Sequence, residues 1–384
     1  MDAKVKNSPG TVRDSILRVL ADAERPLKVS EIIERVQIEL GPTPASSIRS
    51  YLRLNTPDLF IREDRGLYRS KGNGVVSGRQ KALQSDADLH APFTADRATL
   101  HHGDCFSWLE IREANSIHAV VTDPPYGLHE YSDSQQRKLR TGKGGVWRIP
   151  PSFDGHTRSP LPRFTTLDRA QLLELAEFFE VWGKQILRVT VPGANILVAS
   201  NPLVSHIVAM ALGKSGLERR GEIIRLTMTM RGGDRPKGAH NEFADVSVMP
   251  RSMWEPWLLF RKPLEGRVQD NLRKWKTGGF RRPSRDKPFG DVISSSPTRP
   301  EEKKIAPHPS LKPQAFLRQV VRGVLPLGKG IVLDTFAGAG STLAACNAIG
   351  YESIGIERDE AYFALAKDAL PTLSAYSIKS QTSK

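Results

Sequence analysis

The sequence has little cysteine and no long apolar run. Only Cys105 and Cys346 occur among 384 residues, which is too few for a disulfide framework or a cysteine-rich zinc site. No stretch approaches the roughly 18 uninterrupted apolar residues of a membrane-spanning helix, and the first ten residues lack the apolar core of a signal peptide. We therefore expect a soluble protein of a reducing, intracellular compartment that does not contact a membrane.

Acidic residues are also in short supply relative to basic ones. Lysine and arginine total 56 against 42 aspartates and glutamates, which gives a net charge of +14. This excess favours a polyanionic partner, because basic side chains gain affinity by releasing counterions from phosphates. Nucleic acid is the leading candidate, and a merely soluble basic surface is the alternative. With 39% apolar residues, the chain can bury one large core and a smaller one.

Residues 1–70 are expected to form a separate small domain. Apolar spacing and turn residues predict three helices and then two short strands, at 11–20, 30–40, 43–52, 59–62 and 66–69. This order resembles a winged helix-turn-helix and, more narrowly, the HARE-HTH module found at the front of some restriction and modification proteins. The resemblance implies that the third helix faces DNA through Arg49 and Arg53. A module that binds protein, or that only packs, is the alternative.

A polar, glycine-bearing stretch at 71–96 shows no periodicity and predicts a linker. A larger domain is expected over 97–375, followed by a tail at 376–384. Strand patterns fall at 98–100, 117–122, 196–199, 223–230 and 257–260, and helix patterns at 168–188 and 204–212. Their alternation predicts an α/β fold in which helices cover both faces of a parallel sheet.

The turn after the strand at 117–122 is the first of two motifs that carry chemistry. Asp123-Pro124-Pro125-Tyr126 lies where a buried parallel strand ends, which is where α/β enzymes place their sites. The prolines stiffen the backbone and leave its carbonyl groups as acceptors. Asp123 adds a carboxylate, and Tyr126 adds an aromatic face for a planar ring. The set suits the exocyclic amino group of a base, although such a tetrapeptide taken alone is more often an ordinary turn.

The second motif is a glycine turn between a strand at 331–334 and a helix. In Phe336-Ala337-Gly338-Ala339-Gly340, the glycines let the backbone approach a ligand closely, and the helix N-terminus beyond offers donors to a carboxylate. The spacing is not that of the dinucleotide-binding fingerprint. A second strand ends about 20 residues after Asp334 in Glu357, which is placed to hold two ribose hydroxyls. A helix cap or a solvated charge is the alternative for Glu357.

Together the two motifs resemble a β-class amino-group DNA methyltransferase. The Asp-Pro-Pro-Tyr motif precedes the Phe-Ala-Gly-Ala-Gly motif, and His-Pro-Ser-Leu-Lys-Pro at 308–313 lies just upstream of the latter, which is the circularly permuted order of that class. The resemblance covers roughly 98–370. It implies a Rossmann-like fold with a seven-stranded mixed sheet, S-adenosylmethionine as cofactor, and a target base flipped out of double-stranded DNA. It also implies a cytoplasmic, nucleoid-associated prokaryotic protein, with a cognate restriction endonuclease and a second copy of the chain as candidate partners.

The resemblance assigns residues by position. Asp123, Pro124, Pro125 and Tyr126 would form the catalytic turn. The cofactor would contact Asp104, Cys105, His308, Ser310, Lys312, Asp334, Phe336, Gly338, Gly340, Ser341, Thr342 and Glu357. No metal is needed, and neither cysteine has the proline-cysteine context of C5 chemistry.

Two basic segments are expected to contact DNA. The stretch at 128–167 is too long and polar for an ordinary connection, and it predicts a mobile loop that contacts DNA through Arg140 and Lys143. An insertion at about 261–304 combines basic and aromatic residues and would serve target recognition. Its candidate contacts are Arg273, Lys274, Lys276, Arg281 and Arg282. Surface loops without a role in binding are the alternative for both segments.

The predicted reaction is direct methyl transfer to the N6 amine of adenine. If Asp123 and the Pro124 carbonyl accept the hydrogens of the amine, its nitrogen can pyramidalise and attack the methyl group in line, while Tyr126 stacks on the flipped base. The same acceptors suit the N4 amine of cytosine, which is the nearest alternative, and an RNA substrate is a weaker one. From another class, the chain could be a DNA-binding regulator that has lost catalysis.

Overall fold

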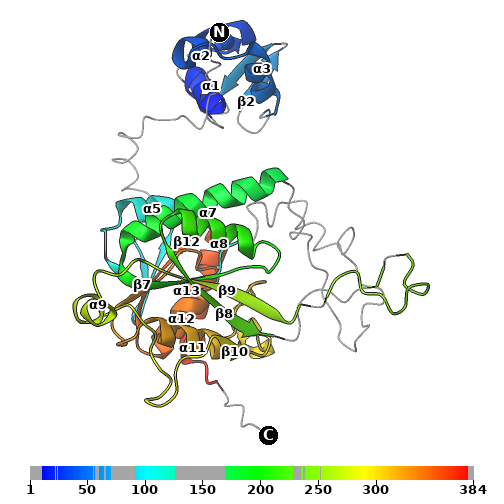
Figure 1. The fold of residues 1–384 in the computed structure, drawn as a ribbon. Coiled ribbons are helices and arrows are strands. Elements are labelled where there is room, and N and C mark those ends of the chain that lie inside the picture. Colours follow the sequence, from blue (N-terminus) through cyan, green and yellow to red (C-terminus); the bar gives the residue numbers. More distant parts are fainter. Residues whose placement is uncertain are drawn as a thin grey trace. The chain divides into compact units, whose positions relative to one another are not determined.

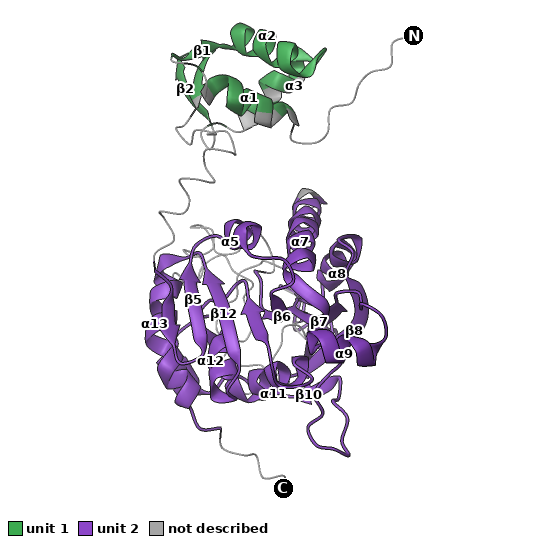
Figure 2. Ribbon diagram, turned by 90° about the vertical axis from the view of Figure 1, so that its left-hand side faces the viewer, with its two compact units in different colours: residues 1–88 green, residues 89–384 purple. Residues whose placement is uncertain are grey.

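The computed structural model divides the chain into two compact units, Met1–Asp88 and Leu89–Lys384 (Figures 1 and 2). The residues that it describes are 11–21, 23, 25–54, 56, 60–64, 66–70, 91–125, 169–227, 235–236, 238–250 and 252–378. The loop predicted at 128–167 and most of the linker predicted at 71–96 lie outside these residues.

In the first unit, helices pack against a small antiparallel sheet. Its elements over the described residues are α1 (Thr11–Ala21), β1 (Leu27–Lys28), α2 (Val29–Leu40), α3 (Ala45–Leu54), β2 (Phe60–Asp64) and β3 (Leu67–Ser70). The strands pair in the order β1-β3-β2. Ile16, Ile32 and Ile48, one from each helix, are buried together with Phe60 of β2, as helical spacing of the apolar residues predicts. The predicted three helices and hairpin are present, and β1 is an additional short strand.

The second unit is built on one large sheet with the strand order β10-β8-β9-β7-β6-β11-β12-β5-β4 in the described part of the chain. Its strands are β4 (Phe93–Ala95), β5 (Ala98–His102), β6 (Ile117–Thr122), β7 (Thr190–Ala199), β8 (Glu218–Leu226), β9 (Trp254–Arg261), β10 (Val292–Ser294), β11 (Ile331–Asp334) and β12 (Glu352–Glu357). Its helices there are α5 (Cys105–Ile111), α7 (Arg169–Val189), α8 (Ser205–Lys214), α9 (Val268–Trp275), α10 (Pro300–Ile305), α11 (Gln314–Val324), α12 (Ser341–Ala348) and α13 (Glu360–Ala375).

Helices cover both faces of this sheet (Figure 2). On the central strand β6, Val120 packs into the core formed with α5, α7 and α8, whereas its neighbour Val121 packs into the core formed with α11 and α12. Side chains of a strand alternate between the two faces, so a strand buried on both sides has the continuous apolar run seen at 119–121. The predicted layers are therefore confirmed.

The sheet is mixed, as the resemblance implies, but it is larger than the resemblance implies and not wholly parallel as the strand and helix patterns predict. It has nine strands in the described residues rather than seven, because the three-residue edge strands β4 and β10 are too short to show periodicity. Since β4 pairs with β5, residues 93–95 belong to the sheet and not to the predicted linker. Strands β7, β6, β11, β12 and β5 are parallel, whereas β9 is antiparallel to both β7 and β8.

The five parallel strands give the sheet two distinct edges. We call the edge at which they end the carboxyl edge; it includes Thr122, Asp334 and Glu357. The opposite edge, at which they begin, is the amino edge. Because β9 runs the other way, it starts at the carboxyl edge and delivers Arg261 to the amino edge. The connection from β8 to β9 leaves from the carboxyl edge, where Thr227 N–H donates to the Met253 carbonyl at 2.7 Å.

Among the described residues, no helix combines the length and apolarity that crossing a membrane requires.

Candidate active site

A cavity of about 630 Å³ opens at the carboxyl edge of the sheet. Its lining comes from the ends of β6, β11 and β12, the start of α5 and the segment at 308–312. Strands β6 and β11 are adjacent and parallel, so they end side by side. The sheet thereby brings together two motifs that lie far apart in the sequence.

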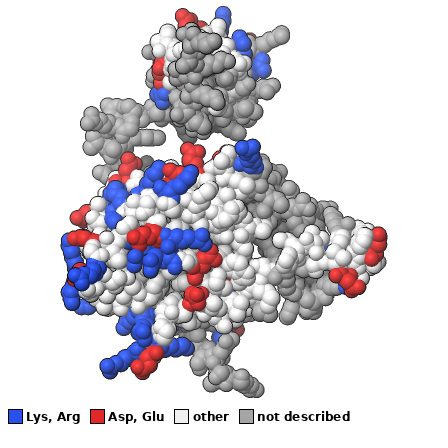
Figure 3. Space-filling view, viewed as in Figure 1, with Lys and Arg blue, Asp and Glu red and all other residues white. Residues whose placement is uncertain are grey.

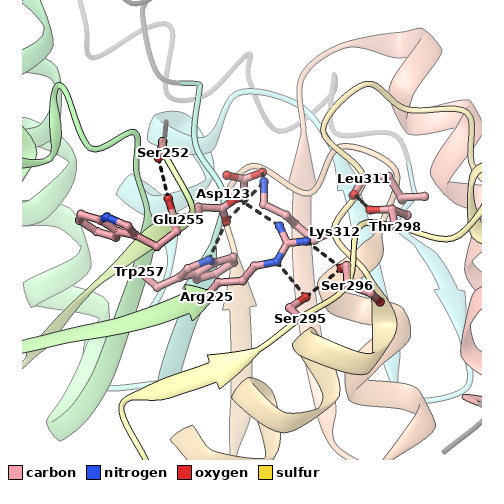
Figure 4. Close-up of polar contacts among 11 residues, drawn as sticks. Asp123, Arg225, Ser252, Glu255, Trp257, Ser295, Ser296, Thr298, Leu311 and Lys312 are labelled. Carbon is pink, nitrogen blue, oxygen red and sulfur yellow. Dashed lines mark hydrogen bonds and ion pairs between the residues drawn. The ribbon is translucent and has the colours of Figure 1, made fainter. Parts of the chain in front are cut away.

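Asp123, Pro124 and Pro125 line this cavity directly after β6. The Lys312 ammonium pairs with Oδ2 of Asp123 (Figure 4), and the two side chains are only 9% and 18% exposed, respectively. Burial lowers the pKa of Lys312, but the carboxylates of Asp123 and Glu255 raise it, and the net pKa lies above its ordinary value. Lys312 is therefore a cation beside the catalytic turn.

The glycine turn lines the same cavity. Gly338 and Gly340 have φ angles of 51° and 76°, in the left-handed region that favours glycine. A Cβ added to Gly338 would lie 3.2 Å from Nε2 of His308, so the imidazole packs closely against the turn. Nδ1 of His308 accepts the Ser310 N–H at 3.1 Å, and burial, helped by Lys312, lowers the pKa of His308 to about 4. These contacts assign a neutral ring with its proton on Nε2, beside Gly338.

Glu357 joins three loops of the cavity. Its carboxylate accepts the N–H groups of Gly338 at 2.7 Å and of Asp359 at 2.8 Å, while its backbone carbonyl accepts the Gly103 N–H at 3.0 Å. Burial raises the pKa of this carboxyl, and the backbone donors oppose that rise. The residue predicted to hold ribose therefore also organises the glycine turn.

Asp334 connects the two motifs directly. Its Oδ1 accepts the Thr122 hydroxyl at 2.6 Å and the Phe336 N–H at 3.1 Å. Burial nevertheless raises the pKa of Asp334 to about 6, because these donors only partly replace water around the carboxylate.

The start of α5 completes the wall next to Glu357. Oδ1 of Asp104 caps the helix by accepting the N–H groups of Phe106 and Ser107 at 3.0 and 3.1 Å. The Cys105 thiol is buried, which raises its pKa to about 12, so it lines the cavity as a neutral apolar group.

The predicted cofactor residues converge on the cavity, with one exception. Its lining includes Asp104, Cys105, His308, Ser310, Lys312, Asp334, Phe336, Gly338, Ser341, Thr342 and Glu357. Gly340 is not part of the lining; a Cβ there would meet Ala366 of α13 at 3.5 Å. Its direct contact with the cofactor stays a prediction; in the structure this glycine precedes α12 in a left-handed conformation and packs beside α13.

The sequence matches a family model of N6/N4 DNA methylases over residues 117–368. The chain belongs to this DNA methylase family. Its members use S-adenosylmethionine as methyl donor.

Similar curated proteins are type II methyltransferases. M.HindIII of Haemophilus influenzae is 24% identical over 294 residues, which cover 71% of this chain and 94% of the relative. M2.DpnII of Streptococcus pneumoniae is 23% identical over 285 residues, which cover 72% of this chain and 91% of the relative.

Solved structures of methyltransferases also match this chain over most of its length. The cytosine-N4-specific PvuII DNA methyltransferase has a TM-score of 0.48 and 11% identity, with 75% of this chain and 95% of that chain covered. A complex of M1.HpyAVI with S-adenosylmethionine has a TM-score of 0.44 and 19% identity, with 71% and 98% covered.

The cavity of this methylase fits the family's methyl donor. Its volume lies within the range of small-molecule sites, roughly 300–1,000 Å³. The absent side chain of Gly338 leaves room against His308, and the cavity walls carry the carboxylates of Asp334 and Glu357 for polar groups of a nucleoside or an amino acid. The apolar Phe336 ring, which contacts Trp182 at a centroid distance of 6.2 Å, supplies a surface that excludes water.

The basic residues of α9 and the loop after it, which are predicted to contact DNA, do not line the cavity. Helix α9 lies at the amino edge, where Asn271 Nδ2 donates to the Pro192 carbonyl near the start of β7 at 2.8 Å, and Arg281 donates to the Tyr351 hydroxyl just before β12 at 2.6 Å. Lysine and arginine gather over this edge in Figure 3. The predicted insertion at 261–304 is therefore not one unit beside the cavity: its first part lies at the amino edge, and only β10 leads back to the carboxyl edge, parallel to β8.

Several of these basic groups are paired locally. Arg273 pairs with Asp270 at 3.1 Å, and Lys274 pairs with Glu265. Lys276 donates to the Arg273 carbonyl, and Arg282 donates to the Arg285 carbonyl at 3.0 Å. In the first unit, Arg49 is exposed on α3. Tyr126, Arg140, Lys143 and the side chain of Arg53 lie outside the described residues.

Sequence reasoning missed a pair of charged residues behind Lys312. Arg225 of β8 and Glu255 of β9 are register partners and form an ion pair of 3.1 Å, each side chain being 8% exposed. Oε1 of Glu255 lies 4.0 Å from the Lys312 ammonium. The available signal was a charged residue inside each of two otherwise apolar strand patterns, at 223–226 and 254–260, since buried charges require partners.

Proposed function

We propose that this DNA methylase transfers a methyl group from S-adenosylmethionine to the N6 amine of an adenine flipped out of duplex DNA. The observation that carries the proposal is that Asp123, which follows β6, and the glycine turn, which follows β11, line the same cavity. An amine acceptor and a nucleoside-binding turn on adjacent strands are what such a transfer requires.

The cofactor side of the cavity is assigned to the glycine turn and Glu357. When bound, S-adenosylmethionine supplies an electrophilic methyl group on a sulfonium sulfur. Glu357 is positioned to accept ribose hydroxyls while it retains the Gly338 N–H, since each carboxylate oxygen has two lone pairs. Asp334 and the neutral His308 line the remainder of this wall and are assigned to the amino-acid portion.

The base side is assigned to the catalytic turn. The Asp123 carboxylate and the Pro124 carbonyl are acceptors on a backbone stiffened by two prolines, and they would take the two hydrogens of the amine. This removes the lone pair of the nitrogen from conjugation with the ring and aligns it for attack. Tyr126 is assigned to stacking on the flipped base.

The first unit is assigned to DNA as a winged helix-turn-helix, with Arg49 and Arg53 on α3 at the duplex. Its helices followed by a hairpin support this assignment. The order of the catalytic and glycine motifs supports a circularly permuted β-class enzyme. Type II relatives support a cytoplasmic role beside a cognate restriction endonuclease, and a second copy of the chain is a further candidate partner.

The deciding experiment is incubation of unmethylated duplex DNA with S-adenosylmethionine carrying a labelled methyl group, followed by digestion and nucleoside mass spectrometry. Label in N6-methyladenine is the expected result. Label in N4-methylcytosine would replace adenine by cytosine as the target, because the same acceptors suit that amine. Cofactor binding without label in any nucleoside would instead identify a DNA-binding regulator.

A further inference from the structure

Four charged side chains form an alternating row that ends at the cavity (Figure 4). Asp123 pairs with Lys312, Lys312 approaches Glu255 at 4.0 Å, and Glu255 pairs with Arg225 at 3.1 Å. They come from the turn after β6, the segment before α11, and the adjacent strands β9 and β8. Negative and positive groups alternate, so Lys312 lies between the carboxylates of Asp123 and Glu255.

We propose that Glu255 is a positioning residue for methyl transfer, which holds the Lys312 ammonium and through it sets the orientation of the Asp123 carboxylate. The inference rests on the proposed function, in which Asp123 accepts a hydrogen of the target amine. Glu255 itself does not touch the base.

Glu255 is well suited to hold a flexible lysine. Its Oε1 accepts the Trp257 indole N–H at 2.8 Å, and its Oε2 accepts from Arg225. Two separate donors therefore fix both oxygens of the carboxylate. Lysine reaches its partners on a long stem with freely rotating donors, so a second fixed anion beside Asp123 restricts where its ammonium lies.

Arg225 is fixed in turn. Its Nε donates to the Ser295 hydroxyl at 3.1 Å, and a terminal nitrogen donates to the Ser296 carbonyl at 3.4 Å. Its guanidinium also lies over the Phe316 ring of α11, 5.5 Å from the centroid. The far end of the row is thus anchored to the residues that follow β10 and to α11.

Stability alone does not account for this arrangement. Burying ion pairs is costly, and well-packed apolar residues often stabilise an interior equally well or better. The same two strands carry a second ion pair, Arg261 with Glu218 at 2.7 Å, but it lies at the amino edge. Of the two pairs, only Arg225 with Glu255 continues through Lys312 to a residue that lines the cavity.

The central test is Glu255→Gln, which keeps the shape and an acceptor for Trp257 but removes the charge that faces Lys312. We expect the single-turnover methylation rate at saturating DNA and cofactor to fall at least about tenfold, because small misalignments of reacting groups have large kinetic costs. The dissociation constants for S-adenosylmethionine and for DNA should stay within about twofold of wild type, since Glu255 touches neither. Glu255→Asp, which restores the charge, should recover part of the rate.

Glu218→Gln is the matched control, because it neutralises the other ion pair on the same strands. It should leave the single-turnover rate unchanged. Base flipping, followed by 2-aminopurine fluorescence at the target position, should persist in Glu255→Gln, since the lost step is alignment after flipping. A Glu255→Gln rate within twofold of wild type would overturn the inference, as would an equal loss in Glu218→Gln.

A second variant covers the case in which Glu255→Gln does not fold, as judged by its thermal melt. Arg225→Lys keeps a cation opposite Glu255 but gives up the bond to Ser295 and the planar contact with Phe316. Arg225→Lys should lower the methylation rate several-fold at unchanged cofactor affinity. A wild-type rate in this variant would refute the proposal that the row positions Asp123. Failure of the wild-type protein to methylate DNA would instead count against the proposed function.

Discussion

The carboxyl edge and the amino edge of the same sheet carry charge in opposite ways. At the carboxyl edge, Lys312, Glu255 and Arg225 are buried, Asp123 is half-buried, and the four form a row that ends at one cavity. At the amino edge, the basic residues of α9 and the following loop are more numerous and mostly exposed, and Arg273 and Lys274 pair with acidic residues near them in the sequence. Burial and convergence, rather than the amount of charge, therefore distinguish the site from a solvated surface.

The largest effect is expected from removing the acceptor at the carboxyl edge. Asp123→Ala should abolish methyl transfer, by about a thousandfold or more, because it removes both the hydrogen-bond acceptor and the alignment of the amine. Cofactor affinity, measured by titration calorimetry, should remain, since the glycine turn is untouched. An active Asp123→Ala enzyme would contradict the catalytic assignment of Asp123. It would also show that burial and convergence of charge do not distinguish the site at the carboxyl edge from the exposed charges at the amino edge.

A buried carboxylate at this edge should also show in the pH dependence of stability. The pKa of Asp334 is raised from 3.8 to about 6 in the folded protein, so between these values the folded state binds more protons than the unfolded state. Its contribution is favourable below about pH 4 and is lost as the pH rises through about 6.

The comparison with Asp334→Asn isolates this effect. Relative to wild type, the free energy of unfolding of the variant should rise by up to about 3 kcal/mol between pH 4 and pH 7. Urea denaturation at both pH values measures this difference. A difference between the two proteins that does not change with pH would show that the Asp334 carboxyl is not shifted by burial.

Two glycine substitutions distinguish backbone strain from a direct effect on cofactor binding. Gly338→Ala and Gly350→Ala both place a side chain at positive φ, 51° and 77°, so each should destabilise the fold by about 1 kcal/mol. Only the Cβ at position 338 would crowd His308, whereas the one at 350 meets no atom within 4 Å. Calorimetry should show at least about tenfold weaker cofactor binding for Gly338→Ala alone. Equal affinities in the two variants would remove Gly338 from the cofactor wall.

The smallest effect is expected at the amino edge. Arg273→Gln with Lys274→Gln removes two exposed charges of α9, whose side chains are 77% and 59% exposed. Duplex affinity should fall only a few-fold, and its salt dependence should weaken by no more than about two ion equivalents. The single-turnover rate should stay unchanged. A loss of rate comparable to that of Asp123→Ala would show that target recognition extends to the amino edge.

The sequence predicted where the Asp-Pro-Pro turn and the glycine turn lie, because both are local features at strand ends. Asp123 and Gly338 could be placed without knowing which strands pair, since the ends of parallel strands meet at one edge. The pairing of Arg225 with Glu255 could not be predicted, because it depends on the register of an antiparallel pair separated by a long connection.

The same reversal explains where the basic insertion at 261–304 begins. A parallel strand ending at Arg261 would have left the chain at the carboxyl edge, beside the cavity. Because β9 is antiparallel to β7, the following basic residues begin at the amino edge instead. Alternation of strand and helix patterns predicts the layers of such a fold, but it does not reveal the direction of a strand whose two faces are both apolar.

The two ends of the connection between β8 and β9 lie side by side, which makes this connection a suitable place to graft a segment from another protein. The Thr227 N–H to Met253 carbonyl bond continues the strand pairing of Leu226 with Trp254, so the two ends of the connection are already held together by the sheet. Exchanging the residues between 227 and 253 for those of another methylase would add little loop-closure cost, which grows only slowly with length. Chimeras joined at Thr227 and Met253 would therefore exchange this connection and leave the residues that line the cavity unchanged.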